Sequence, residues 1–277
     1  MKKKALICSL LFVMICMSGC SVIRKEMRSG MKWQVTVSFT PLLDFTKKIG
    51  GDKVSVSDVT PSIENPHTYQ PPVRKLKKLK DAELFIYQGN VENWSQNVVQ
   101  ENKNLSSIQA DQGIDLLEED NGKNPHIWLN PQYAKVELAN IRDALVSLDP
   151  DEKSYYEKRY QKYAKEFDAL DASFKKALSP YRGKRIIAMN DSLRYLCDAY
   201  GLKLTVVHKT SDLAKDDRVV YYDDFTDPTV LRGGENVKRI RIHTFDGRTS
   251  EEKKDKKGYE TLMKENLELL VKELKQG

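Results

Sequence analysis

The histidines are the residues of this chain best suited to bind a metal ion, and two of the four share a local sequence. His67 and His126 each end a tripeptide that reads Asn-Pro-His, at 65–67 and at 124–126. Neutral imidazole is the most common side-chain ligand for zinc and related ions. A single histidine in a loop is usually only exposed to solvent. Two in the same context, near predicted sheet edges, favour a shared metal site.

Strands and helices alternate along the chain, and this pattern predicts parallel sheets covered by helices. The expected strands lie at 33–39, 54–59, 84–87 and 107–110, and then at 185–188, 204–207, 219–222 and 239–242. Ligands of open α/β sheets bind at the carboxyl ends of the strands. The loops that follow the strands, including those with His67 and His126, are therefore where a site is expected.

Long amphipathic helices are expected at 131–148, at 150–178 and at 259–274, where apolar residues recur every three or four positions. The middle helix would be about 29 residues and about 43 Å long. Such a helix is expected to be a spine between two lobes. The predicted division is an N-terminal α/β lobe at 33–148, a linking helix at 149–180 and a reduced C-terminal lobe at 181–277.

The N-terminal segment has the features of an export signal. Three lysines precede an apolar run at 5–17, which is too short to span about 30 Å of hydrocarbon. The run ends in Met-Ser-Gly-Cys, which resembles a bacterial lipobox and would make Cys20 the lipidated first residue. We therefore expect a signal peptide at 1–19, a tether at 20–32, and a lipid anchor that holds the protein on the outer face of the cell membrane.

The composition excludes several classes of protein. Hydrophobic residues make up 40% and charged residues 31%, which fits neither a multi-span membrane protein nor a disordered chain. The net charge of +6 (46 basic against 40 acidic) falls to +3 when the three lysines of the signal leave, because 43 − 40 = 3. So small a surplus gives little support for a nucleic-acid partner. Of the four cysteines only Cys197 would remain free, so no intrachain disulfide is expected.

Several motifs together resemble the zinc/manganese solute-binding lipoproteins of ABC importers, the cluster A-I family. They stand in order at 35–42, 49–52, 65–69, 79–94, 124–131 and 259–266. The resemblance implies two α/β lobes joined by one long rigid helix, with the ion between the lobes. It also implies that the protein is a monomer, catalyses no reaction and delivers Zn²⁺ or Mn²⁺ to an ABC permease.

The same resemblance implies four protein ligands, of which three can be placed. His67 and His126 match the two ligands of the N-terminal lobe, and Asp246 matches the acidic ligand before the last helix. The remaining ligand is open, because many relatives have His-Asp-Ala-Phe where this chain reads Asn190-Asp-Ser-Leu. We expect His208 to supply this ligand if its strand shifts by one residue. Asn190, as a weak amide donor, or a water is the alternative.

The choice of ligand bears on the ion and on rival functions. Three imidazoles and one carboxylate would favour Zn²⁺, whereas oxygen donors would favour Mn²⁺. Asp223 follows a predicted strand and could either support the site or cap a helix.

Two rival functions remain. One is an adhesion or interaction lipoprotein with a degenerate metal site. Asn190, and a C-terminal lobe that is short for the family, point to this function. The other is an exported metal-dependent hydrolase, but the sequence has neither HExxH nor GxSxG.

Overall fold

The computed structural model describes residues 30–119, 122–231 and 236–276. The chain divides into two units, residues 1–33 and 34–277, and the description below concerns the second. The predicted signal peptide at 1–19, the lipidation site Cys20 and most of the predicted tether lie outside the described residues. In the part of the chain that the structure describes, no helix is long and apolar enough to cross a membrane.

The first sheet follows the expected strand–helix alternation. Its order is β2-β1-β3-β4, and β3 pairs in parallel with both β1 and β4. The strands are β1 (Trp33–Val37), β2 (Val54–Asp58), β3 (Leu84–Tyr87) and β4 (Ser107–Gln109), and the helices between them are α2 (Thr40–Gly50), α3 (Val73–Leu79) and α4 (Asn93–Glu101). Part of its core is a cluster of Val59, Leu79, Phe85, Trp94 and Val98.

The second sheet is wholly parallel and has the order β10-β9-β7-β8. Its strands are β7 (Arg185–Ala188), β8 (Lys203–Val206), β9 (Val219–Tyr222) and β10 (Lys238–Arg241), and its helices are α7 (Arg194–Tyr200), α8 (Ser250–Lys254) and α9 (Tyr259–Leu274). A second buried cluster of Ile187, Met189, Val207, Val220 and Leu231 packs on this sheet. Each sheet thus has a core of its own, as the fold class requires.

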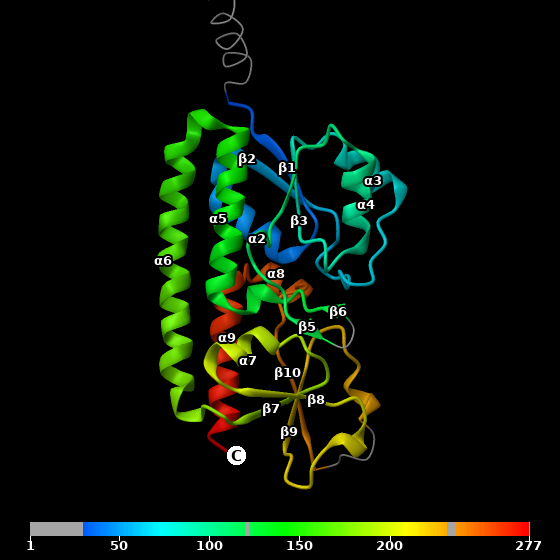
Figure 1. The fold of residues 1–277 in the computed structure, drawn as a ribbon, viewed down its shortest axis with the longest axis vertical. Helices are drawn as coiled ribbons and strands as arrows, with labels where there is room; N and C mark the ends of the chain where they lie inside the picture. The colour runs from blue at the N-terminus through cyan, green and yellow to red at the C-terminus, as the bar shows by residue number, and fades with distance from the viewer. Residues whose placement is uncertain (1–29, 120–121, 232–235, 277) are drawn as a thin grey trace, which may run out of the picture. The chain divides into compact units, whose positions relative to one another are not determined.

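Helix α6 (Lys153–Leu178) joins the two lobes and has 26 residues, which is about 39 Å. It packs beside α5 (Pro131–Leu148) and α2 and also against α9 and α7 (Figure 1). Phe167 of α6 contacts Phe45 at 5.6 Å and Tyr259 at 4.9 Å between ring centroids. One helix therefore shares its buried face with both lobes, and the expected spine is confirmed.

The structure differs from the sequence predictions at the shortest elements. The predicted helix at 150–178 begins as a 3-10 turn at Pro150–Glu152, so its α-helical part is shorter. A small antiparallel pair, β5 (Glu118–Glu119) and β6 (Gly122–Lys123), was not predicted, because two residues are too few to show alternation. Helix α8 was missed too, although Thr249 and Glu252 form a capping box at its start.

Candidate metal centre

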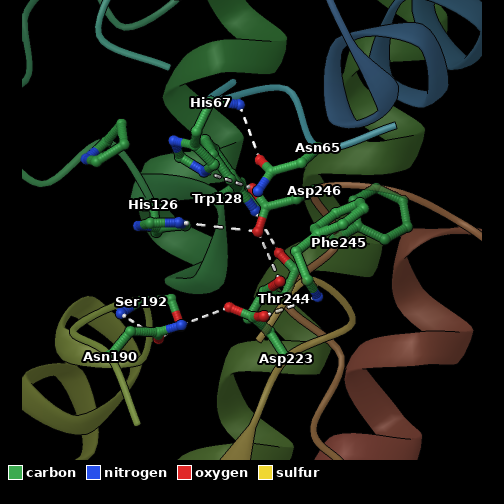
Figure 2. Close-up of polar contacts among 12 residues, drawn as sticks. Asn65, His67, His126, Trp128, Asn190, Ser192, Asp223, Thr244, Phe245 and Asp246 are labelled. Atoms are coloured by element: carbon green, nitrogen blue, oxygen red, sulfur yellow. Dashed lines mark hydrogen bonds and ion pairs between the residues drawn. The ribbon is translucent and has the colours of Figure 1, made fainter. Parts of the chain in front are cut away.

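Three of the four predicted ligands converge at the carboxyl ends of the strands. His67, His126 and Asp246 each offer a ligand atom, and these atoms all lie within 4.8 Å of one another. Nε2 of His67 is 3.4 Å from Oδ1 of Asp246, and Nε2 of His126 is 3.8 Å from Oδ2 (Figure 2). Two imidazole nitrogens and a carboxylate at this spacing can surround one divalent transition metal ion.

The two Asn-Pro-His tripeptides form the same local turn. Oδ1 of Asn65 accepts the backbone N–H of His67 at 3.0 Å, and Oδ1 of Asn124 accepts that of His126 at 3.1 Å. Asparagine commonly forms such a bond to the backbone two residues on, and the intervening proline fixes its own φ. The repeated tripeptide therefore fixes the backbone conformation at each histidine.

His126 is held further by the side chain of Asn124. Oδ1 of Asn124 lies 2.9 Å from Nδ1 of His126, while its Nδ2 donates to the backbone oxygen of Asp191 at 2.9 Å. An amide oxygen can only accept, so Nδ1 carries the proton in this arrangement. The lone pair of Nε2 is then free on the side that faces Asp246, as metal binding requires.

A strained loop carries Asp246 into the site. Phe245 has a positive φ of 65°, which costs on the order of 1 kcal/mol or more for a bulky residue. Its N–H donates to Nδ1 of His243 at 2.9 Å, and Asn266 holds His243 by accepting its N–H at 3.0 Å and donating to its oxygen at 2.6 Å. These bonds hold the turn that directs Asp246 toward the histidines.

The carboxylate of Asp246 has one oxygen to spare. Asp246 is 2% exposed, and its Oδ2 accepts the Thr244 hydroxyl at 2.6 Å. Among the described residues Oδ1 accepts no hydrogen bond and has only the ion-pair distance to His67. A buried carboxylate oxygen without a donor is costly unless a cation occupies the space beside it. The buried carboxylate oxygen of Asp246, which has no donor among the described residues, therefore indicates that the site fits a metal ion.

The protonation equilibria of the three side chains are coupled. Burial alone would lower the pKa of His67, but the neighbouring Asp246 carboxylate outweighs burial and raises it. Burial lowers the pKa of His126, and the nearby His67 adds to that effect. Burial would raise the pKa of Asp246, yet His126 and His67 bring it below its usual value. A carboxylate and at least one neutral imidazole are thus available near neutral pH.

His208 is not brought to the other three ligands. Its side chain is exposed, and it does not line the cavity of about 190 Å³ beside His67, His126 and Asp246. The backbone N–H of His208 and that of Lys209 both donate to Oδ2 of Asp212, at 2.9 and 3.1 Å. This turn draws the segment after the outer strand β8 to the surface, so the prediction for His208 loses its geometric support.

Asn190 lines the cavity, but its amide oxygen is engaged elsewhere. Oδ1 accepts the N–H of Ser192 at 3.2 Å and the hydroxyl of Ser192 at 2.5 Å. Nδ2 donates to Asp223, which lies beside it at the same edge of the cavity (Figure 2). Asn190 therefore presents donor hydrogens rather than a free oxygen, which is unsuitable for a cation. The expectation that it serves as a replacement ligand has no support from its orientation.

Sequence reasoning undervalued three residues of the site. Asp223 is 8% exposed and lines the cavity, although its sequence position allowed a helix cap equally well. Its position directly after a strand was the signal that could have placed it. Asn65 and Asn124 orient the histidines, and the Asn-Pro pair was the signal for their turns.

Comparison with known proteins identifies the family. The family model described as the periplasmic component A of the zinc-uptake complex matches residues 35–273. This chain belongs to that family. It is 28% identical to the high-affinity zinc uptake system protein ZnuA of Bacillus subtilis (strain 168), over 87% of each chain. It is 30% identical to the manganese ABC transporter substrate-binding lipoprotein PsaA of Streptococcus anginosus, over 73% of this chain and 70% of PsaA.

Solved structures of the family share the fold. The metal-dependent lipoprotein YcdH of Bacillus subtilis superposes with a TM-score of 0.79 at 29% identity, over 87% of this chain and 98% of YcdH. The Zn(II)-bound ZnuA-like domain of Streptococcus pneumoniae AdcA gives 0.80 at 25% identity, over 87% and 98%. The chain spans 57% of the longer AdcA chain. The two-lobed α/β architecture is thus that of these solved structures.

Proposed function

We propose that this protein captures a divalent transition metal ion outside the cytoplasm and delivers it to the permease of an ABC importer. The observation that carries the proposal is the convergence of His67, His126 and Asp246 around a buried carboxylate oxygen that accepts no hydrogen bond among the described residues. The relatives named for zinc uptake and for manganese transport support the class of cargo and of partner. The ion is cargo, so the site binds and releases it and catalyses no reaction.

The geometry bears on which ion is carried. The preference for Zn²⁺ rested on a third imidazole from His208, whose exposed side chain does not line the cavity. Two imidazoles with oxygen donors suit Zn²⁺ and Mn²⁺ alike, and supply outside the cell then decides the cargo. We therefore assign the cargo as Zn²⁺ or Mn²⁺.

Calorimetric titration of chelator-treated protein with Zn²⁺ and with Mn²⁺ tests this function. The intact chain is expected to bind one ion with a dissociation constant below about 1 μM, which corresponds to about 8 kcal/mol. His67→Ala and His126→Ala each remove a ligand and should weaken binding by more than about 100-fold, since even outer partners of ligands contribute 10–100-fold.

His208→Ala is the matched control, because it removes an imidazole from the exposed turn outside the cavity. It should bind as the unmodified chain does. Loss of binding in this variant would show that His208 is a ligand, and would contradict an ion site at His67, His126 and Asp246 that excludes His208. An unmodified chain that binds neither ion below micromolar concentration would rule out the transport function.

The anchoring of the protein follows from its N-terminal sequence. We propose that residues 1–19 are a signal peptide, that Cys20 carries the lipid and that 20–32 tether the lobes at 33–148 and 181–277 to the outer face of the membrane. A monomer is proposed, as one chain supplies every ligand named here. Mass spectrometry of the mature N-terminus checks the anchor: an unmodified N-terminus at any other residue would contradict it.

Adhesion or another interaction is the second candidate function, favoured by Asn190 in the place of an imidazole. In that case the metal site would be degenerate. The calorimetric titration separates the two functions, because a degenerate site would not hold Zn²⁺ or Mn²⁺ at micromolar concentration.

A further inference from the structure

The second sheet brings an amide and a carboxylate together at the cavity. Ala188 of β7 and Tyr221 of β9 are partners in the parallel register, and Asn190 and Asp223 each follow two residues later. The carboxyl ends of neighbouring parallel strands meet at one edge of a sheet, where ligands bind. Both side chains line the same cavity as His67, so the second lobe presents a carboxylate to the first.

Asp223 is held in place and still has free acceptor positions. Its Oδ2 accepts from Nδ2 of Asn190 at 2.5 Å, and its Oδ1 accepts the N–H of Phe225 at 2.9 Å. A carboxylate has about four acceptor positions, so these two bonds leave about two open. Asn190 is itself fixed, because its Nδ2 also donates to the Thr226 hydroxyl at 3.1 Å.

The charge of Asp223 has no cationic side chain against it. Asp223 is 8% exposed, and in the described part of the chain it forms no ion pair with a lysine or arginine. The next residue, Asp224, is paired with Arg241. A carboxylate that is nearly buried and unpaired is costly, and a metal ion in the cavity would relieve that cost.

We propose that Asp223 is a ligand of the transported ion and that Asn190 is a positioning residue that holds its carboxylate toward the cavity. This inference rests on the proposed function and names the missing donor of the same site. The donor set becomes two imidazole nitrogens from His67 and His126 and the carboxylates of Asp246 and Asp223. Relative to a site with three imidazoles, this set favours Mn²⁺, because carboxylate oxygen suits Mn²⁺ and imidazole suits Zn²⁺.

Asp223 lies apart from the three ligands that converge. Asp223 is not among the groups whose ligand atoms lie within 4.8 Å of one another. The cavity of about 190 Å³ is well above the roughly 10–15 Å³ that a single water needs, so it has room for an ion and several waters. Direct coordination of the same ion by Asp223 therefore requires its carboxylate to come closer to His67, His126 and Asp246 than it lies in this structure.

Two matched variants test whether Asp223 is a ligand. Asp223→Asn keeps the shape and removes the charge, while Asp224→Asn makes the same change in the neighbour that pairs with Arg241. Mn²⁺ and Zn²⁺ affinities are measured by competition with a chelator, and Co²⁺ absorption reports the donors around the ion. Asp223→Asn should weaken Mn²⁺ binding by more than about 100-fold, Asn190→Ala by about 10–100-fold and Asp224→Asn by less than about tenfold.

The Co²⁺ spectrum separates a ligand from a structural role. It should change with Asp223→Asn and stay unchanged with Asp224→Asn, in protein that circular dichroism shows to be folded. If Asp223→Asn does not fold, Asn190→Ala serves instead, because it removes the bond that holds the Asp223 carboxylate and should weaken Mn²⁺ binding by about 10–100-fold. An unchanged Mn²⁺ affinity and Co²⁺ spectrum in that variant overturn the inference.

Other outcomes distinguish this inference from the proposed function. If Asp223→Asn binds Mn²⁺ as the unmodified chain does, with the same Co²⁺ spectrum, Asp223 is not a ligand. The proposed function still stands in that case, provided His67→Ala abolishes binding. If Asp191→Asn rather than Asp223→Asn weakens binding, the wrong carboxylate of the cavity has been assigned. If His67→Ala binds the ion unchanged, the proposed function itself fails.

Discussion

The two histidines of the metal centre stand in the same tripeptide but in different surroundings. The side chain of His67 is 31% exposed, whereas that of His126 is 9% exposed and lies 5.3 Å from the Trp128 ring. Oδ1 of Asn124 contacts both the backbone and the ring of His126, whereas Oδ1 of Asn65 accepts the backbone N–H of His67. The shared turn sets the backbone of both histidines, and the packing beyond the turn makes them different.

This difference gives the histidines different tasks in metal capture. Burial lowers the pKa of His126, which therefore stays neutral with Nε2 ready to coordinate. The Asp246 carboxylate, outweighing burial, raises the pKa of His67, so His67 takes up a proton before His126 does as the pH falls. An arriving ion then has to displace a proton from His67 but not from His126.

The pH dependence of metal affinity is the largest expected effect and tests this contrast. The ion binds neutral imidazole, so affinity is full above the raised pKa of His67 and is lost as the pH falls through it, by about tenfold per pH unit. The loss reaches this slope only below the raised pKa of His67, so affinity should fall more steeply below that pKa than above it. Titration of the two imidazole proton resonances by NMR, in protein without metal, should show His67 titrating above about pH 6.5 and His126 below it.

Asp246→Asn removes the carboxylate beside His67 and should bring the pKa of His67 down. Two results would contradict the difference in pKa between His67 and His126: the same pKa for both rings, or an unchanged pKa of His67 in Asp246→Asn.

The periodicity of the chain predicted most of the fold. Strands β3, β7 and β9 and helices α5 and α9 begin and end where the apolar pattern places them. Alternation over four or more residues, or a helical stripe over several turns, is a signal that local sequence carries by itself. Strands β5 and β6 are too short to give such a signal, and they form by pairing with each other.

The site was less predictable, because its ligands depend on long-range packing. The shared Asn-Pro-His turn is local, and its sequence alone points to His67 and His126. The orientation of Asp246 depends on a bond from Phe245 to His243 and on Trp128, which donates to the carbonyl of Thr244 at 2.7 Å. His208 was favoured for its chemistry alone, and the turn at Asp212 exposes it. Spacing cannot reveal such a turn.

The role of Asn124 gives the second expected effect. Asn124→Ala removes the acceptor that holds Nδ1 of His126 and the bond to Asp191, so the ring loses its fixed orientation. Metal affinity should fall by about 10–100-fold, as it does for other groups that orient a ligand imidazole. Asn124→Asp is the control, since its carboxylate still accepts from Nδ1 and should preserve affinity. Equal losses in both variants would show that the bond to Asp191, rather than ring orientation, matters.

The same change at Asn65 should have the smallest effect and completes the comparison. Asn65→Ala removes only the bond to the backbone N–H of His67, at 3.0 Å; such a bond contributes about 1 kcal/mol, or about fivefold in affinity. The ring of His67 keeps its ion pair with Asp246, which lies on another loop. Calorimetry of Asn65→Ala beside Asn124→Ala measures the difference directly. Equal losses would mean that the common turn, and not the surroundings of each ring, determines how well the histidines hold the ion.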